Sequence, residues 1–284
     1  MSKKRMIMEK AIELFSQNSI ETTSIQDITT ACGISKGAFY LSFKSKDDLL
    51  VEIVDYFMKK IILQHNIVLN DPISGEKKLR KFFYSNFKLL EENYSFITMC
   101  MREQLHPIND QIVQKLNDFS AINDETILIL INETYGNLLG EGKFDLLTSI
   151  KGLMWSFTEF IATHPAQYDL EKLTDTLLEK TNILAKHSSI HFLNETIWRS
   201  QSTEFNRNEI SKEKVLEELE RSNETFEHSP IILESLQLLK SELETPSPRL
   251  AILLGLAANL QRRDEFSWLT FLIKQYTATL GKES

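Results

Sequence analysis

The chain has 284 residues, of which 42% are hydrophobic and 25% charged, with only 9 glycines and 6 prolines. This length exceeds a typical single domain, and the composition excludes collagen-like, low-complexity or largely disordered chains and favours a helical globular protein. The net charge of −8 argues against nucleic-acid binding by the chain as a whole.

The charge is unevenly distributed along the chain. Residues 1–50 contain seven Lys and Arg against six Asp and Glu, a net charge of +1, which leaves 25 against 34 and a net charge of −9 for the remainder. This asymmetry permits a DNA-facing head on an acidic body. The two cysteines, Cys32 and Cys100, together with the absence of a signal peptide and of a long apolar span, predict a cytoplasmic protein with reduced thiols and no membrane contact.

The first two predicted helices follow each other closely. Apolar residues recur on one face from Ile7 to Phe15, and Asn18-Ser19 closes this amphipathic helix. Thr23 or Ser24 then begins a second helix, since each has a capping-box partner three residues later. The sequence alone does not decide which of the two residues is the N-cap.

A glycine turn separates the second helix from a third. Gly33 breaks the pattern, and Ser35 is placed to cap a short helix through residues 36–40. Ile34 and Phe39 have the spacing of a hydrophobic staple, which fixes the angle at which the chain enters that helix. Ser45 begins a fourth helix, whose buried side runs from Leu49 to Phe57.

A capped helix, a glycine turn and a serine-capped second helix have the spacing of a helix-turn-helix. The runs 22–28, 32–40 and 43–50 together resemble the N-terminal signature of the TetR family of bacterial repressors. Leu41 and Ser42 depart from the aromatic or histidine pair that the family often has there, so the resemblance transfers no DNA sequence preference. It implies an all-α fold with a three-helix DNA-binding head at 1–46 and a ligand-binding and dimerisation body at 47–187, and the remaining residues, 188–284, are expected to form an additional helical region.

The third helix is the expected reading helix, because the N-terminal part of the second helix of such a motif enters the major groove. Its polar residues and the flanking donors give the expected DNA contacts: Thr23, Ser24, Ser35, Lys36, Gly37, Tyr40, Lys44 and Lys46. Helix caps and tight turns explain Thr23, Ser24 and Gly37 equally well, and Ser35 is a cap in either interpretation.

Aromatic and methionine residues gather in the helices of the body. In the family that the head resembles, these helices enclose an apolar ligand cavity, so Phe83, Phe87, Met99 and Trp155 are the expected ligand contacts, with a small apolar or amphipathic effector. The alternative is that these side chains form an ordinary core.

Two later helices carry apolar seams, at 144–162 and 170–184. The resemblance implies that such helices form a four-helix bundle between two subunits, which matches a palindromic operator. Charges at Leu153 and Leu177 are then expected to split a homodimer. The alternative is that both seams are internal.

Residues 188–284 extend beyond the usual family body. Helices are expected at 209–224, 231–243, 250–260 and 266–280, with a linker at 244–248. This region either enlarges the dimer face, caps the ligand cavity or binds another protein.

The sequence contains no phosphate loop, dinucleotide fingerprint, paired zinc-ligand motif or nucleophile elbow, so no enzyme, catalytic residue, metal or cofactor is expected. His187 and His191, four residues apart, are read as ordinary residues. The predicted function is a ligand-responsive repressor that binds double-stranded DNA as a homodimer. The alternative is a DNA-bound adaptor whose signal is a protein docking on residues 188–284.

Overall fold

The computed structural model describes residues 3–102, 110–164, 166–201, 210–225, 230–261, 263 and 266–280, and all regular structure within them is helical. This confirms the all-α prediction. The helices of the first 201 residues are α1 (Lys3–Asn18), α2 (Ile25–Cys32), α3 (Lys36–Tyr40), α4 (Lys46–Leu69), α5 (Glu76–Glu92), α6 (Tyr94–Arg102), α7 (Asp110–Tyr135), α8 (Lys143–Thr163), α9 (Leu170–His187) and α10 (Glu195–Gln201). Two short 3-10 turns, Gly136–Leu138 and Gly140–Gly142, join α7 to α8.

The chain divides into two compact units, Met1–Glu204 and Phe205–Ser284. The sequence placed the start of the additional region at residue 188. In the structure, however, both the segment between α9 and α10 and helix α10 itself pack on the first unit. Trp198 stacks on Phe144 of α8 with 5.9 Å between ring centroids. The Asp145 carboxylate accepts hydrogen bonds from the N–H groups of Phe192 and Leu193, each at 3.1 Å. These contacts fix residues 192–198 against the start of α8.

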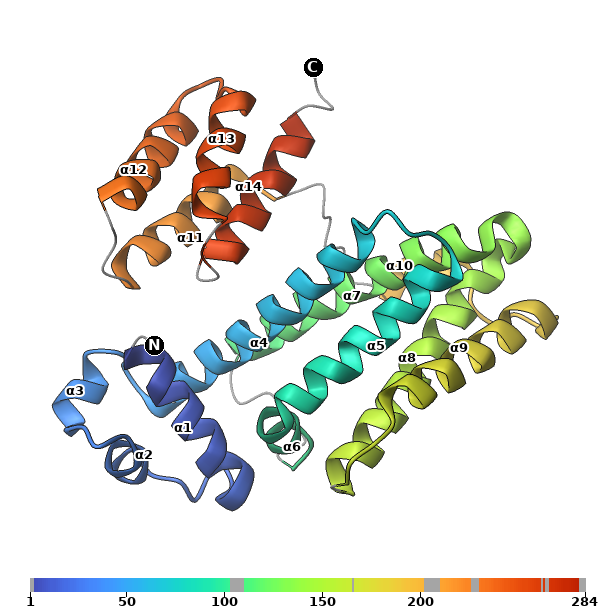
Figure 1. The fold of residues 1–284 in the computed structure, drawn as a ribbon, viewed down its shortest axis with the longest axis horizontal. Helices are drawn as coiled ribbons and strands as arrows, with labels where there is room; N and C mark the ends of the chain where they lie inside the picture. The colour runs from blue at the N-terminus through green and yellow to red at the C-terminus, as the bar shows by residue number, and fades with distance from the viewer. Residues whose placement is uncertain are drawn as a thin grey trace. The chain divides into compact units, whose positions relative to one another are not determined.

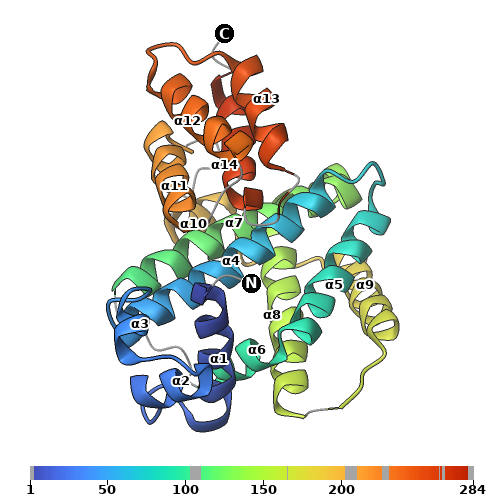
Figure 2. The same ribbon diagram turned by 60° about the vertical axis from the view of Figure 1, so that its left-hand side comes forward.

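In the first unit, α1, α2 and α3 form a small cluster from which the long helix α4 runs beside α5 and α7 (Figures 1 and 2). The predicted apolar face of α1 is buried, with Ile7, Ala11 and Phe15 fully enclosed. The buried side of α4 likewise follows the prediction from Leu49 to Phe57. The head and the body are therefore joined by a continuous helix.

The body is a set of helices packed around a core of aromatic and aliphatic side chains. Helix α5 packs against α4, α7 and α9, and helix α8 packs against α7 and α9. The core is built from Val68, Leu79, Phe82, Phe83, Phe87, Ile127, Leu130, Ile131, Leu147, Ile150 and Leu177, among others. Leu177 of α9 is fully buried in this core, and Leu153 of α8 is partly buried and packs against it. A charge at Leu177 would therefore disrupt the core of the unit itself, which differs from the expected effect on a homodimer alone.

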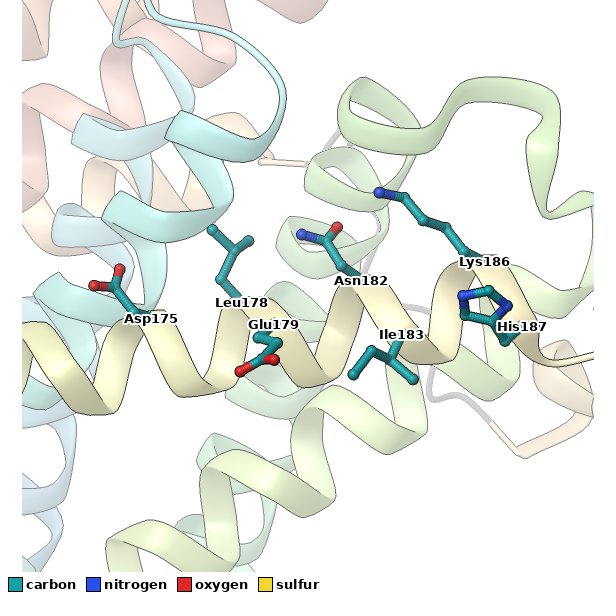
Figure 3. Close-up of a pocket in the computed structure, with 7 residues that line it drawn as sticks. All are labelled: Asp175, Leu178, Glu179, Asn182, Ile183, Lys186 and His187. Atoms are coloured by element: carbon teal, nitrogen blue, oxygen red, sulfur yellow. The ribbon is translucent and has the colours of Figure 1, made fainter.

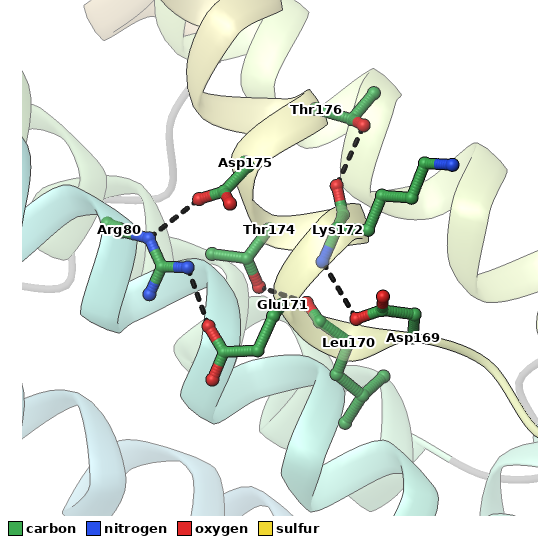
Figure 4. A network of polar contacts seen from close by, with 8 residues as sticks. All are labelled: Arg80, Asp169, Leu170, Glu171, Lys172, Thr174, Asp175 and Thr176. Atoms are coloured by element: carbon green, nitrogen blue, oxygen red, sulfur yellow. Dashed lines mark hydrogen bonds and ion pairs between the residues drawn. The ribbon is translucent and has the colours of Figure 1, made fainter.

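A polar clamp holds α9 on α5 (Figure 4). The Arg80 guanidinium donates from Nε to Asp175 at 2.7 Å and from Nη2 to Glu171 at 2.6 Å. These two carboxylates raise the pKa of Arg80. Asp169 caps α9 by accepting a hydrogen bond from the Lys172 N–H at 3.0 Å. The start of α9 is thus fixed in register against α5.

The second unit consists of α11 (Lys212–Thr225), α12 (Pro230–Glu244), α13 (Leu250–Leu260) and α14 (Ser267–Leu280). Each helix packs on its neighbours along the chain, and α14 also packs on α11. Val215 and Leu219 of α11 are buried, and Leu216 is partly buried. The expected linker at 244–248 lies between α12 and α13.

A charged clamp closes the corner between α12 and α13. Glu242 is buried, and its carboxylate accepts hydrogen bonds from the N–H (2.7 Å), Nε (3.0 Å) and Nη2 (2.7 Å) of Arg249. These hydrogen bonds lower the pKa of Glu242 from 4.5 to about 2. The ionised carboxylate therefore belongs to the folded state.

Replacing Glu242 with Gln is expected to destabilise the second unit at neutral pH, because the amide keeps the volume but loses the charge that Arg249 binds. Since the folded pKa is depressed, the stabilisation is fully present above pH 4.5 and is lost as the pH falls towards 2. Urea unfolding followed by Trp268 fluorescence, in a chain whose Trp155 and Trp198 are replaced by Phe, measures this. If the difference in unfolding free energy between the chain with Glu242 and the Glu242→Gln chain does not shrink as the pH falls from 4.5 to 2, the ionised Glu242 does not stabilise the unit through Arg249.

Two further features bear on function. Within the part of the chain that the structure describes, no helix is long and apolar enough to cross a membrane. Among the same residues, no group of three or more His, Cys, Asp or Glu is placed to hold a metal ion. His187 ends α9 and His191 lies in the following non-helical segment, so the two histidines do not share a helix face.

Candidate nucleic-acid interface

The turn between α2 and α3 is specified by local hydrogen bonds. Ser24 is the N-cap of α2: its Oγ accepts from the Asp27 N–H at 3.2 Å, and the Asp27 carboxylate accepts from the Ser24 N–H at 2.8 Å. The Ser24 hydroxyl also donates to the Asp27 carboxylate at 2.6 Å, and the two hydrogen bonds that this carboxylate accepts, from the hydroxyl and from the N–H of Ser24, lower the pKa of Asp27. Of the two N-caps that the sequence left open, the structure therefore selects Ser24 over Thr23.

Gly33 and Ser35 complete the turn. Gly33 ends α2 in the left-handed conformation with φ of 64°, where a side chain is strained, and its N–H donates to Thr30 O at 3.1 Å. The Ser35 Oγ accepts from the Ala38 N–H at 3.2 Å. The predicted glycine turn and serine cap are both confirmed.

Helix α3 lies over an apolar support and presents a polar face. Phe39 and Phe43 are buried beneath it, together with Ile28 of α2. Ser35, Lys36 and Gly37 are exposed, and Tyr40 is 54% exposed with its ring edge-on to Phe39. The short helix is thus held by its core side and free on its outer side.

Gly37 has no role in the packing of the protein itself. A Cβ built at this position meets only Ser35 Oγ, at 3.8 Å. A glycine that the fold does not require, on an exposed helix face, fits the close approach of another molecule to the backbone.

Lys46 takes a different position from the one expected. Its ammonium donates to the carbonyl oxygens of Ile20 (2.7 Å), Glu21 (3.3 Å) and Thr23 (3.0 Å). An ammonium has three protons to donate, and all three are used by the segment before α2. Lys46 therefore stabilises the head, and the expectation that it contacts a phosphate is revised.

Thr23 is also structural. Its side chain is only 2% exposed, and its hydroxyl donates to Ser19 O at 2.7 Å. The hydroxyl is not available to a phosphate. Lys44, in contrast, is exposed, while its N–H donates to the Asp48 carboxylate at 2.8 Å. Exposed Leu41, next to Tyr40, adds an apolar side chain to this surface that the sequence had marked only as a departure from the family pattern.

The four expected ligand contacts do not form one cavity. Phe83 and Phe87 are buried in the body core, whereas Met99 is buried in the cluster that includes the head. Trp155 is 61% exposed on the outer side of α8, so it is not a cavity residue. The helical period predicted an apolar α8 but did not indicate which apolar residues face inward.

Two hollows among the described residues of the first unit bear on ligand binding. One of about 390 Å³ follows a single stripe of α9 (Figure 3) and is lined by Asp175, Leu178, Glu179, Asn182, Ile183, Lys186 and His187. The other, of about 260 Å³, is lined by Phe87, Leu90, Glu91, Tyr94, Ile161, Ala166, Tyr168 and Leu170. Phe87 is the only expected ligand contact in either of these two linings.

One apolar cluster spans the head and the body. It contains Ile7 and Phe15 of α1 together with Phe57 of α4, and Phe96 and Met99 of α6. The rings of Phe57 and Phe96 stack with centroids 3.8 Å apart. Helix α1 also packs directly along α6. A movement of α6 therefore cannot leave the head unaffected.

Comparison with known proteins agrees with this geometry. Residues 7–53 match the family described as bacterial regulatory proteins, tetR family. The uncharacterized HTH-type transcriptional regulator YerO of Bacillus subtilis (strain 168) is 27% identical over 261 residues, which cover 91% of this chain and 89% of YerO. YuxN, an uncharacterized HTH-type transcriptional regulator of the same strain, is 25% identical over 288 residues, 96% of this chain and 98% of YuxN.

A solved structure shares the fold of part of the chain. The transcriptional regulator FadR from Bacillus subtilis, in complex with stearoyl-CoA, aligns with a TM-score of 0.55 and 22% identity, covering 66% of this chain and 100% of that chain. About a third of the present chain thus has no counterpart in FadR, whereas the matches to YerO and YuxN extend over nearly all of it.

Proposed function

We propose that the chain, whose residues 7–53 match the tetR family of bacterial regulatory proteins, is a TetR-family repressor that binds a palindromic operator as a homodimer and is released by a small ligand. The relatives YerO and YuxN are named as HTH-type transcriptional regulators, which supports a DNA-binding regulator rather than an enzyme. The observation that carries the proposal is the outer face of α3, where polar side chains are exposed to solvent while Phe39 and Phe43 are buried on the inner side. A helix presented in this way fits the major groove.

The proposed DNA contacts are Ser24, Ser35, Lys36, Gly37, Tyr40 and Lys44. Lys36 supplies a charge for a guanine edge or a phosphate, and Tyr40 supplies a hydroxyl and an apolar ring for a thymine methyl. Ser24 lies at the N-terminus of α2, where N–H groups suit a phosphate. Thr23 and Lys46 act indirectly, by holding the segment that places α2.

The proposed dimer surface is the outer side of α8 and α9. Trp155 and Phe160 of α8 are exposed, and Ile183 of α9 is 52% exposed beside the hollow along that helix (Figure 3). Large apolar side chains that are exposed on these two helices support burial against another molecule. A second copy of the same surface would place two reading helices for the two halves of a palindrome.

The proposed release mechanism uses the apolar cluster shared by α1, α4 and α6. A ligand that binds better to a rearranged body shifts α4 and α6, which changes the separation of the two reading helices. The coupling cannot exceed the difference in ligand affinity between the two states, typically about 1 to 3 kcal/mol or roughly five- to 150-fold in DNA affinity.

The chain is expected to bind its own upstream DNA with an affinity that falls steeply with salt, because phosphate contacts release counterions. Between 50 and 200 mM salt, labelled-duplex anisotropy should lose on the order of a thousandfold in affinity. A scrambled duplex of equal length is the control. A lack of binding at low salt, or equal binding to both duplexes, would refute an operator-specific repressor.

The alternative is a DNA-bound adaptor whose signal is a protein docking on the second unit. Exposed Ile231, Leu238 and Leu254 on α12 and α13 favour it. A full chain that binds its upstream DNA but responds to no small molecule, and that associates with one defined protein through these residues, would support the adaptor.

A further inference from the structure

The hollow of about 260 Å³ is formed where four helices meet. Phe87, Leu90 and Glu91 come from α5, Tyr94 begins α6, Ile161 lies near the end of α8, and Leu170 begins α9. Its walls are apolar, since Phe87, Leu90 and Ile161 are buried side chains. Such a cavity favours a ligand with an apolar body.

The polar side chains of this lining are acceptors. The Tyr94 hydroxyl donates to Ala162 O at 3.0 Å, and the Tyr168 hydroxyl donates to His164 O. Because a phenol has one proton to donate, each hydroxyl can only accept a hydrogen bond from a ligand. Glu91 is a carboxylate that is 46% exposed at the rim.

The carboxylate of Glu91, at the rim of the hollow, is accessible to a ligand. Glu91 pairs with Lys88 on the same helix at 2.7 Å, with both side chains about half exposed. An exposed pair of this kind is worth little, so a ligand can replace the lysine. Among the described residues that line the hollow, the side chains thus offer apolar contacts and acceptors and no uncommitted donor.

We propose that this pocket binds a small amphipathic cation, with its apolar part between Phe87, Ile161 and Leu170 and its ammonium group at Glu91. The volume exceeds that of a cavity of about 150 Å³ that holds benzene and lies below the usual range for large ligands of about 300 to 1,000 Å³. A carboxylate or phosphate ligand is disfavoured, because it would face acceptors without a donor.

The pocket adjoins α6, the helix that packs against α1 of the head. Tyr94 is the first residue of α6, and α6 carries Phe96 and Met99 into the cluster shared with α1. A ligand that displaces Tyr94 acts on the helix that supports α1. The ligand class rests on the pocket alone, whereas its role as the effector rests on the proposed function.

The test uses the full chain without DNA and two probes of similar size, phenethylammonium and hydrocinnamate, in calorimetric titrations. The cation is expected to bind at least about tenfold more tightly than the anion. Glu91→Gln should weaken the cation by about three- to tenfold, while Glu92→Gln, one residue further along α5, should leave it within about twofold. Ala166→Trp, at an exposed position of the lining, should block both probes.

Hydrocinnamate binding as tightly as the cation, equal effects of the two glutamine substitutions, or binding that survives Ala166→Trp would each overturn the site. The same cation is then titrated against the chain bound to its upstream DNA. Weaker binding to the complex, by roughly five- to 150-fold, supports the effector role. Unchanged binding leaves the site in place and refutes release by this ligand, and failure of DNA binding refutes the repressor without touching the site.

Discussion

Replacing Leu177 with Glu is expected to unfold the first unit, whereas replacing Trp155 or Ile183 with Glu should leave it folded and abolish its self-association. Leu177 is fully enclosed in the body core, where an unpaired carboxylate has no partner and no water. The cost, more than about 4 kcal/mol, is a large part of the stability of an ordinary domain. Trp155 and Ile183 are more than half exposed, so a charge there costs the monomer little.

Sedimentation at micromolar concentration and far-ultraviolet circular dichroism separate the two effects. Ile67→Glu, at a side chain that is 57% exposed on α4, is the matched control for adding one charge to an apolar surface residue away from α8 and α9. It should remain a folded dimer. A monomeric wild type, or a Trp155→Glu chain that sediments like the wild type, would refute the proposed surface.

The parts of the fold that depend on neighbouring residues were predictable from the sequence. The side chains of Ser24, Ser35 and Ser45 each accept a hydrogen bond from the N–H three residues later, which is the local interaction that makes serine a recognisable N-cap. Gly33 was equally visible, because only glycine adopts its backbone conformation without strain. The exposed face of α3 follows from these caps and from the burial of Phe39.

The parts that depend on distant residues were not predictable. Lys46 bonds to carbonyl oxygens 23 to 26 positions earlier in the chain, and no spacing in the sequence signals such contacts. Helical periodicity identified α8 as apolar, but apolar side chains occur on both its faces, so Trp155 was assigned inward although it is exposed. Pocket linings have the same difficulty, because residues from four helices meet there.

Replacing Lys36 with Ala is expected to weaken DNA binding without changing the thermal stability of the head. Replacing Lys46 with Ala, in contrast, should lower the thermal stability of the head and weaken DNA binding only as a consequence. Lys36 is an exposed residue at the start of α3, so its loss removes a contact that exists only in the complex. The slope of log affinity against log salt should fall by about 1 if the contact is a phosphate. Lys44→Ala, at another exposed lysine, should behave in the same way.

Lys46→Ala leaves the carbonyl oxygens of Ile20, Glu21 and Thr23 without their shared donor. Hydrogen bonds to a charged group are worth about 1.5 to 3 kcal/mol, so a loss of about 2 to 4 kcal/mol is expected for this partly buried set. Hydrogen exchange of the α2 amides should accelerate, and DNA affinity should fall only because α2 and α3 are no longer held. If Lys46→Ala instead keeps the exchange rates and lowers the salt slope as Lys36→Ala does, then Lys46 is a phosphate contact, and its hydrogen bonds to the carbonyl oxygens do not hold the head.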